Sequence, residues 1–251
     1  MKILLIGDTH GGIKPLLKII QASYSYEIDC IFQLGDFGFI MDPKREKDLF
    51  ELLDPAIAAR GIPFYWLDGN HENFDRMAEL GLDRHKSEFQ KLTDHLIYSG
   101  RGNIFDFDGV KFCSYGGAIS VNQDVLIPHI SWWRNEEIDF DHISSIDQPF
   151  DVLLSHDAPI GSARLQAYLD VNDFWPERLQ RLSRFNASFL NDLMVRCGAI
   201  RAYHGHTHFS YHENVKFGNK YRSITGLDKV DKLAENLCCL VVDTSNLKAK
   251  P

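Results

Sequence analysis

The chain has no long hydrophobic run. No stretch approaches the roughly 18 consecutive apolar residues that a membrane-spanning helix needs. The first apolar run, Lys2–Ile6, ends at Gly7-Asp8 and is too short for the apolar region of a signal peptide, so we interpret it as a buried strand. Internal repeats, low-complexity tracts and linkers are also missing from the 251 residues. We therefore expect one globular domain covering residues 1–251, without contact with a membrane.

Cysteine is also scarce. The five cysteines are an odd number and lack the paired spacing of a zinc site: Cys30, Cys113, Cys197, Cys238 and Cys239. We interpret them as reduced, small hydrophobic residues of the core and expect a cytoplasmic protein.

Positive charge is in deficit. The sequence has 27 Lys plus Arg against 35 Asp plus Glu, a net charge of −8. Such a surface repels polyanions on average, which disfavours a protein that coats nucleic acid or adheres to a membrane surface. A local cationic site remains compatible with this composition.

The apolar residues occur instead in short runs that end at glycine or polar clusters, a pattern that predicts buried strands. The seven runs are Lys2–Ile6, Cys30–Leu34, Phe64–Leu67, Val110–Tyr115, Val152–Leu154, Ala199–Tyr203 and Leu237–Val242. Helical periodicity predicts helices over Lys14–Ser23, Asp42–Arg60 and Pro176–Arg196, and residues 103–121 are typical of hairpin strands. This alternation indicates a layered α/β protein with mixed sheets.

Two stretches, 122–150 and 157–180, show the least regular patterns. They carry several aromatic residues, among them Trp132, Trp133, Tyr168 and Trp175. Aromatic side chains in such segments either wall a substrate cleft or anchor a long loop to the core, and the sequence leaves both interpretations open.

Five of the predicted strands end in the same manner, at a Gly or Ser beside an Asp, Asn or His. The strand ends are Gly7-Asp8-Thr9-His10, Gly35-Asp36, Gly69-Asn70-His71-Glu72, Ser155-His156-Asp157 and Gly205-His206-Thr207-His208. Ligands of α/β sheets bind at the carboxyl ends of strands, so we expect these side chains to lie together. Each motif alone is weak evidence for a functional site, since Asp-x-His and Gly-Asp are common in ordinary turns. The five together, in this order, predict a site.

The residue types at these ends suit metal ions. Carboxylate and amide oxygens mixed with imidazole nitrogens bind borderline divalent ions such as Mn, Fe, Co, Ni or Zn. Asp8 and His10 are two residues apart, and so are His206 and His208, a spacing that directs both side chains of an extended segment to one face. The ligands are too many for one ion, so we expect two.

The same five motifs resemble those of the calcineurin-like metallophosphoesterases. The motifs cover residues 7–208 of the chain. The resemblance implies a four-layer α/β/β/α sandwich with two mixed β-sheets and a dinuclear metal centre at the strand ends. It also implies a metal-dependent hydrolase of phosphate monoesters or diesters, whose partner is a small phosphoester substrate.

By this resemblance, one metal is held by Asp8, His10 and His208, and the other by Asn70, His156 and His206, with Asp36 bridging the two. Manganese is the metal we expect first, with Fe, Ni, Co and Zn as alternatives. A metal pair lowers the pKa of a shared water, so that a bridging hydroxide attacks phosphorus and no protein nucleophile is needed.

His71 is not a ligand in the family and is therefore the candidate catalytic residue. It either protonates the leaving oxygen as general acid or only binds a phosphate oxygen. Glu72 and Asp75 are candidates to orient it, because the usual carboxylate partner is missing. His204 and Asp157 lie beside expected ligands, where each either contacts a ligand imidazole or belongs to ordinary strand-end structure.

The sequence departs from the Ser/Thr protein phosphatases of this family. Phe37-Gly38-Phe39-Ile40 follows Gly35-Asp36 where that branch has an Asp-Arg pair, and Asp68 precedes Gly69 where it has an Arg. Two phosphate-binding guanidinium groups are thus missing, which disfavours a protein phosphatase. Arg76, Arg101 and Arg134 are the other candidates for substrate contact.

A diester carries one charge fewer than a monoester and needs fewer cations, so we predict a phosphodiesterase acting on small nucleotides, cyclic ones included. Phe37 and Phe39 would then contact a base. The alternatives are a phosphomonoesterase or protein phosphatase, a dinucleoside polyphosphate hydrolase, less favoured a nuclease, or a non-catalytic scaffold. The sequence predicts no oligomeric state.

Overall fold

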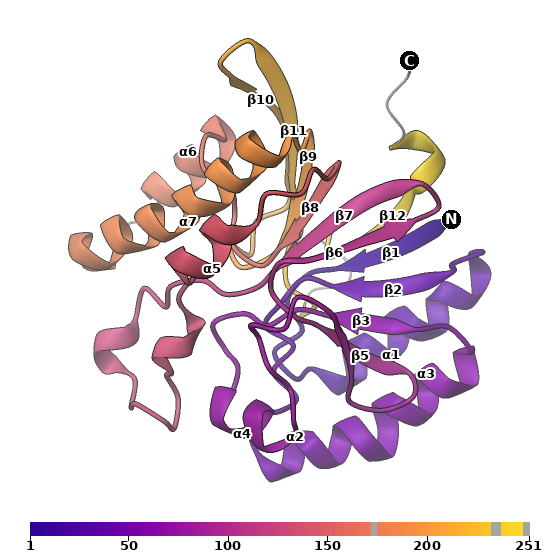
Figure 1. Ribbon diagram of the computed structural model, residues 1–251. Coiled ribbons are helices and arrows are strands. Elements are labelled where there is room, and N and C mark those ends of the chain that lie inside the picture. The colour runs from indigo at the N-terminus through magenta and orange to yellow at the C-terminus, as the bar shows by residue number, and fades with distance from the viewer. Residues whose placement is uncertain (172–174, 232–236, 248–251) are drawn as a thin grey trace.

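Two six-stranded sheets form the centre of the protein in the computed structural model, which describes residues 1–171, 175–231 and 237–247 (Figure 1). The first sheet has the strand order β12-β1-β2-β3-β5-β4, and the second has the order β10-β11-β9-β8-β7-β6. Both are mixed. In the first, β1, β2, β3 and β5 are parallel, while β12 and β4 pair antiparallel at the edges. In the second, β11, β9, β8 and β7 are parallel between antiparallel β10 and β6.

The strands have the following bounds. Those of the first sheet are β1 (Lys2–Ile6), β2 (Cys30–Gln33), β3 (Phe64–Trp66), β4 (Phe89–Lys91), β5 (Leu96–Ser99) and β12 (Cys239–Asp243). Those of the second are β6 (Asn103–Phe107), β7 (Val110–Tyr115), β8 (Val152–Ser155), β9 (Arg201–His204), β10 (Tyr211–Phe217) and β11 (Lys220–Gly226). The chain therefore passes from the first sheet to the second after β5 and returns for β12.

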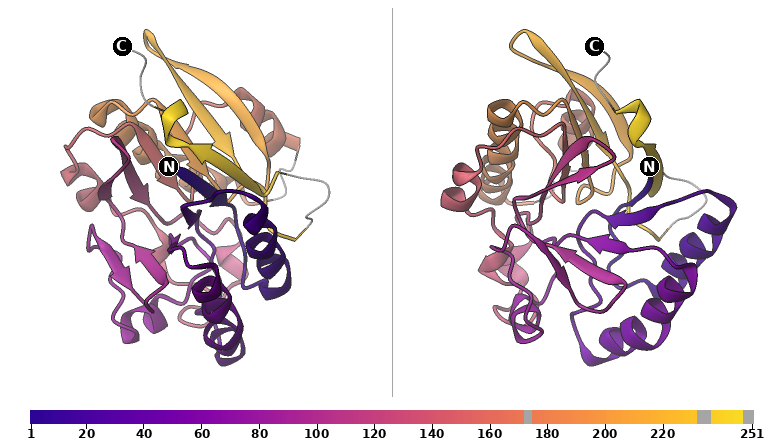
Figure 2. Two further views of the ribbon diagram at one scale, coloured as in Figure 1. Left: turned by 90° about the vertical axis from the view of Figure 1, so that its right-hand side faces the viewer. Right: turned by 45° about the vertical axis from the view of Figure 1, so that its right-hand side comes forward.

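Helices cover the outer face of each sheet. On the first lie α1 (Ile13–Ala22), α2 (Pro43–Asp48), a π-helical segment (Leu49–Leu53), α3 (Asp54–Arg60) and α4 (Phe74–Glu79). On the second lie α5 (Phe140–Ser145) and α7 (Glu177–Cys197), with α6 (Ala163–Val171) against β10. Figures 1 and 2 show the α1–α3 layer and the α7 layer on opposite sides of the paired sheets. The fold is thus the expected four-layer α/β/β/α sandwich.

Strand β1 illustrates why the sequence folds in this way. Ile3 and Leu5 point between the two sheets, while Leu4 and Ile6 point to the helical layer that includes Leu16 of α1. Side chains of a strand alternate between faces, and a strand buried on both faces is therefore apolar throughout. Burying each of these side chains contributes about 1.5–3 kcal/mol to folding.

Local signals set the helix boundaries. The side chain of Asp42 caps α2, accepting hydrogen bonds from the backbone N–H groups of Lys44 (2.9 Å) and Arg45 (3.0 Å), and Pro43 occupies the first helical position. Helix α7 stops at Gly198, whose left-handed φ of 84° closes the helix.

The structure also differs from the sequence prediction. Strands β4, β5, β10 and β11 were not expected, and α5 and α6 lie within the two stretches interpreted as irregular. Residues 172–174 of the second stretch lie outside the described residues. All five cysteines are free, four of them buried. In the part of the chain that the structure describes, no helix has the length and apolarity to cross a membrane.

Candidate metal centre

The strand ends meet at one edge of the two sheets. Asp8 follows β1, Asp36 follows β2 and Asn70 follows β3, all in the first sheet. The second sheet supplies the histidines: His156 follows β8, while His206 and His208 follow β9. Residues from two halves of the chain thus converge at this edge, as the sequence predicted.

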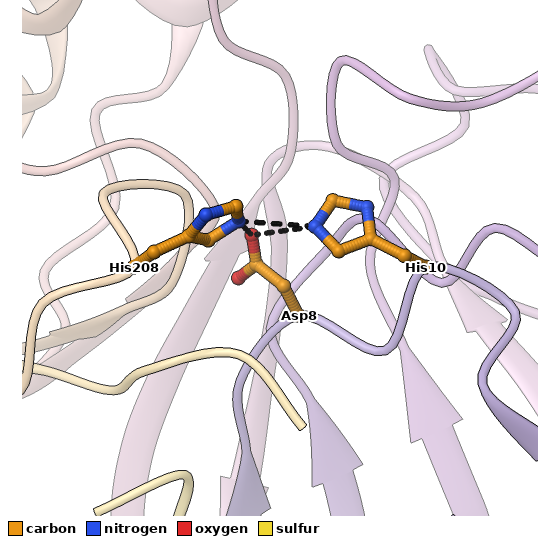
Figure 3. Close-up of side chains that lie close together, drawn as sticks. All are labelled: Asp8, His10 and His208. Carbon is orange, nitrogen blue, oxygen red and sulfur yellow. Dashed lines mark hydrogen bonds and ion pairs between the residues drawn. The ribbon is translucent and has the colours of Figure 1, made fainter. Parts of the chain in front are cut away.

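The first group contains Asp8, His10 and His208 (Figure 3). Nε2 of His10 lies 3.0 Å from Nε2 of His208, and Oδ2 of Asp8 lies 3.1 Å from the His208 nitrogen and 3.8 Å from the His10 nitrogen. The two rings and the carboxylate point toward one another, Asp8 and His10 from the loop after β1 and His208 from the loop after β9. Two imidazole nitrogens and one carboxylate oxygen that converge in this way are a donor set for a divalent cation.

The second group forms around His156. Its Nε2 lies 3.3 Å from Oδ1 of Asp36 and 3.1 Å from Oδ1 of Asn70, and its Nδ1 lies 2.9 Å from the carbonyl oxygen of Leu34. Because a carbonyl only accepts hydrogen bonds, Nδ1 carries a proton, and Nε2 is left to face the site. The His206 ring centroid lies 5.0 Å from that of His156.

Asp36 lies between the two groups. Its Oδ2 is 3.7 Å from Nδ1 of His10, and its Oδ1 is 3.3 Å from Nε2 of His156. The same Oδ1 accepts a 2.8 Å hydrogen bond from the backbone N–H of His71. The carboxylate therefore has one oxygen toward each group, which is the placement that a bridging ligand requires.

The backbone at these loops is unusual. Four of the expected ligands have a left-handed φ, which non-glycine residues rarely adopt: His10 (46°), Asp36 (51°), His206 (62°) and His208 (48°). Such strain costs on the order of 1–3 kcal/mol per residue and is concentrated at functional sites in proteins. Glycines allow the close approach. A Cβ at Gly69 would overlap Oδ1 of Asp36, and one at Gly205 would overlap Oδ1 of Asp8.

The electrostatics of the centre favour bound positive charge. Burial raises the pKa of the Asp8 and Asp36 carboxyls, but the neighbouring histidines outweigh it and hold both pKa values below the usual range. Burial and the positive charge of His156 lower the pKa of His206 to about 3, so this ring is neutral. Burial lowers the pKa of His156, but the adjacent Asp36 carboxylate outweighs it and raises that pKa to about 10. Two ionised carboxylates, the neutral His206 imidazole and an amide oxygen are ligand types that suit a pair of divalent cations, which would replace the proton on His156.

Asn70 is held by residues that the sequence analysis missed. Its Nδ2 donates to Oγ of Ser120 (3.0 Å), whose hydroxyl donates in turn to Oε2 of Glu136 (2.8 Å). Glu136 also accepts the Ser120 backbone N–H (2.7 Å), and burial raises the pKa of its carboxyl to about 7. These contacts direct the Asn70 carbonyl oxygen toward His156. Because they join segments 50 and 16 residues apart, no local pattern in the sequence marks them.

Glu72 and Asp75 do not take the predicted role of orienting His71. The buried Glu72 carboxylate accepts the backbone N–H groups of Phe37 (2.6 Å) and Gly38 (3.2 Å) and so supports the loop after Asp36. Asp75 instead accepts a 2.8 Å hydrogen bond from Nε1 of Trp133.

The three arginines proposed for substrate contact are engaged elsewhere. Arg101 is buried, and its Nε and Nη2 both donate to Oδ2 of Asp68, at 2.9 and 2.6 Å. Arg76 pairs with Glu46 at 2.7 Å, while Arg134 lies on the surface, 84% exposed.

The expectation for Phe37 and Phe39 is wrong as well. Both rings are fully buried, and Phe37 stacks on Trp66 with 4.7 Å between ring centroids. They belong to the core behind the centre and cannot contact a base.

His204 and Asp157 take the ordinary structural roles. Nδ1 of His204 donates to the carbonyl of Gly205 (2.8 Å), and its Nε2 accepts from the Tyr211 hydroxyl (2.8 Å). Asp157 accepts the backbone N–H of Ala158 (2.8 Å), while the His156 ring is oriented by a main-chain carbonyl.

A cavity of about 650 Å³ opens beside the centre. Its wall includes Asp36, Asn70 and His71 on one side and residues of α6 and α7 on the other. Tyr168 and Trp175 line this cavity, and their role in a substrate cleft stays a prediction. Trp132 and Trp133 are not part of the wall.

Comparisons with known proteins agree with this architecture. The model of the family described as calcineurin-like phosphoesterase matches residues 1–210. No curated protein matches the chain. Among solved structures, a phosphopantetheinyl hydrolase from Mycobacterium tuberculosis is similar at 12% identity and a TM-score of 0.53, covering 96% of this chain and 95% of that one. A dimetal phosphatase from Danio rerio is similar at 12% identity and a TM-score of 0.53, covering 92% and 88%. These likenesses show a shared fold.

Proposed function

We propose that this chain, which belongs to the calcineurin-like phosphoesterase family, is a phosphodiesterase that hydrolyses small phosphodiesters with the help of two divalent metal ions. The observation that carries the proposal is the convergence of two donor groups, Asp8-His10-His208 and Asp8-Asp36-His156, whose ligand atoms lie within 4.8 Å of one another in each group. Family membership supports the coarser activity, a metal-dependent phosphoester hydrolase. The diester substrate is our finer proposal.

We assign Asp8, His10 and His208 to one ion and Asn70, His156 and His206 to the other, with Asp36 shared. When bound, manganese or a similar divalent pair lowers the pKa of a water and neutralises charge on the phosphoryl oxygens. The chain itself supplies the position and orientation of the ligands. Its loops hold seven ligand side chains in place, and the Leu34 carbonyl fixes the tautomer of His156.

His71 lies beside His10, at the wall of the cavity. Its ring centroid is 5.4 Å from that of His10, and the residue lines the cavity that begins at the centre. The Asp36 carboxylate accepts a hydrogen bond from the backbone N–H of His71. We propose that the His71 imidazole donates a proton to the leaving oxygen, a step that contributes about 100- to 10,000-fold in enzymes.

The charge of the cavity favours a diester over a monoester. Among the described residues of its wall, Arg184 is the one Lys or Arg. A monoester dianion needs more positive charge than this wall offers beyond the metals, whereas a diester monoanion does not. The preference for small nucleotides, cyclic ones included, rests on the size and mostly apolar wall of the cavity. Phe37 and Phe39 do not support it, because both rings are fully buried and do not reach the cavity.

The test compares bis(p-nitrophenyl) phosphate with p-nitrophenyl phosphate in the presence of Mn²⁺. We expect faster turnover of the diester and a loss of at least about 100-fold in Asp36→Asn. Faster turnover of the monoester would replace the proposal with a phosphatase. Bound metal without any turnover would indicate a non-catalytic scaffold.

A second measurement examines His71. A general acid matters most for a poor leaving group, so His71→Ala should lower the rate on an alkyl ester about 100-fold and have little effect on a p-nitrophenyl ester. Equal losses on both esters would show that His71 only binds the phosphate.

A further inference from the structure

We propose that the cavity between the metal centre and helices α6 and α7 binds the larger esterifying group of the substrate, and that this group combines a flat, mostly apolar ring with a second negative charge. This inference rests on the phosphodiesterase activity proposed above and names the substrate class for the same centre.

The size and position of the cavity are the first support. Its volume of about 650 Å³ falls within the 300–1,000 Å³ typical of small-molecule sites. The wall begins at Asp36, Asn70 and His71 and continues to Leu165 and Ala187. A phosphodiester whose phosphorus lies at the metal ligands therefore has room for one large group in this direction.

The wall is mostly apolar and partly aromatic. Leu165 and Ala187 are buried side chains of α6 and α7. The Tyr168 ring stacks on Phe209, with 4.3 Å between centroids and planes 3° apart, so its orientation is set. Trp175 adds a second aromatic ring to the wall and is 41% exposed. Flat rings pack well against such side chains.

Arg184 supplies the charge. It is exposed on α7 and forms no ion pair or hydrogen bond within residues 1–171, 175–231 and 237–247. Its neighbours on the helix differ: Arg178 pairs with Asp124 at 2.6 Å, and Arg181 pairs with Glu177 at 3.2 Å. The Asp170 carboxylate on the same wall accepts a 2.7 Å hydrogen bond from Gln166. The Arg184 guanidinium is thus available to bind an anionic group of a ligand.

These features together describe a substrate whose larger group carries both a flat ring and a second anion. The scissile diester lies at the metals, the ring lies between α6 and α7, and the second anion contacts Arg184. A dinucleotide that carries a terminal phosphate has this chemistry, and it provides a probe that differs from a control substrate by one group.

The experiment measures kcat/KM with Mn²⁺ for adenylyl-(3′,5′)-adenosine with and without a 5′-phosphate. Methyl p-nitrophenyl phosphate, which leaves the cavity empty, reports on the metal centre alone. We expect the phosphorylated dinucleotide to be preferred about tenfold. Arg184→Gln should remove this preference without changing turnover of the methyl ester. Arg181→Gln, the matched control on the same helix, should retain it.

A second variant fills the cavity. Ala187→Leu should lower kcat/KM for both dinucleotides about tenfold or more and leave the methyl ester unaffected, which also shows that the variant folds. An equal rate on the two dinucleotides in the unmodified protein, with the methyl ester hydrolysed, would overturn the inference and leave the proposed function standing. Absence of turnover on the methyl ester as well would overturn both.

Discussion

Asn70 presents an amide to the centre, and an amide has two nearly isosteric ends. Only its carbonyl oxygen can face a cation, because the NH₂ group is a donor. The hydrogen bond from Nδ2 to Ser120, which itself donates to Glu136, favours the correct end. Ser120 and Glu136 are therefore positioning residues that orient Asn70, one of the proposed ligands.

Removing the Ser120 hydroxyl should accordingly weaken metal binding. We expect Ser120→Ala to lower Mn²⁺ affinity about 10- to 100-fold, since loss of a group that orients a ligand has this effect. Calorimetric titration of the metal-free protein with Mn²⁺ measures it. Ser99→Ala is the matched control, because Ser99 is equally buried but bonds to Ser114. Equal losses in the two variants would contradict the positioning role.

His204 should make the metal-free protein sensitive to acid. Burial lowers the pKa of this imidazole to about 4, against 6.5 in a model peptide. Between these values the unfolded chain binds a proton that folded His204 does not, so stability is present above pH 6.5 and is lost as the pH falls toward 4. A shift of this size corresponds to about 3 kcal/mol.

Urea unfolding with a chelator at pH 4.5 and pH 7 checks this prediction. His204→Gln should show a smaller stability difference between the two pH values than the unmodified protein, whatever its absolute stability. The same difference in both proteins would mean that other groups dominate the acid sensitivity.

Strand ends and their glycines are the elements that shape the centre. Gly69 lies between β3 and Asn70, and a Cβ there would overlap Asp36. We therefore expect Gly69→Ala to displace the Asp36 carboxylate, the proposed bridging ligand, and to lower turnover at least about 100-fold. The measurement is kcat for the diester together with Mn²⁺ affinity.

Gly81→Ala is the control for that substitution. Gly81 has a left-handed φ of 79° and no atom near its would-be Cβ, so the change should cost about 1 kcal/mol of stability and leave metal binding intact. Unchanged Mn²⁺ binding in Gly69→Ala would show that the loop tolerates the methyl group.

The strands and helices also show which parts of the fold the sequence alone could predict. Strands β1, β2 and β3 were predictable because both of their faces are buried, which makes them continuously apolar, and a proposed ligand lies in the loop after each. Hairpin β10–β11 was missed because exposed polar residues such as His212 and Lys216 interrupt its pattern, and Figure 2 shows it projecting beyond the rest of its sheet. Helix α6 was missed because it buries little besides Leu165.

The same limit applies within the site. Ligand types shortly after a strand are a local pattern, so Asp8 and His206 could be proposed as ligands from the sequence alone. The residue that a side chain contacts, however, often lies far away in the sequence. The sequence could not show that Arg101 pairs with Asp68 inside the protein, or that Phe37 packs against Trp66 instead of facing the cavity.

For the whole molecule, the proposed ligands join two separate sheets. Asp8, Asp36 and Asn70 follow strands of the first sheet, and His156, His206 and His208 follow strands of the second. A metal pair bound by all of them would resist separation of the sheets. Binding to the folded state alone stabilises it by about 2.7 kcal/mol when the free metal is at 100 times its Kd.

Metal removal should therefore lower the melting temperature. For a chain of this length the stabilisation corresponds to about 5–10 °C, measured by thermal unfolding with Mn²⁺ and again with a chelator. Asp36→Asn should show a much smaller difference between the two conditions. An identical difference in the variant would place the stabilising ion elsewhere on the protein.

The arrangement of the two sheets has a consequence for synthesis of the protein. Residues 1–99 contain Asp8, Asp36 and Asn70 but none of the histidines of the second sheet, and the strand that pairs with β1 is β12, at Cys239–Asp243. While the ribosome extends the chain, the emerging first half therefore presents an unpaired edge at β1 and an incomplete set of the proposed ligands. Capture of a metal pair by these ligands would wait until β9 and the loop after it have left the exit tunnel, so the proposed centre would assemble late in the synthesis of the chain.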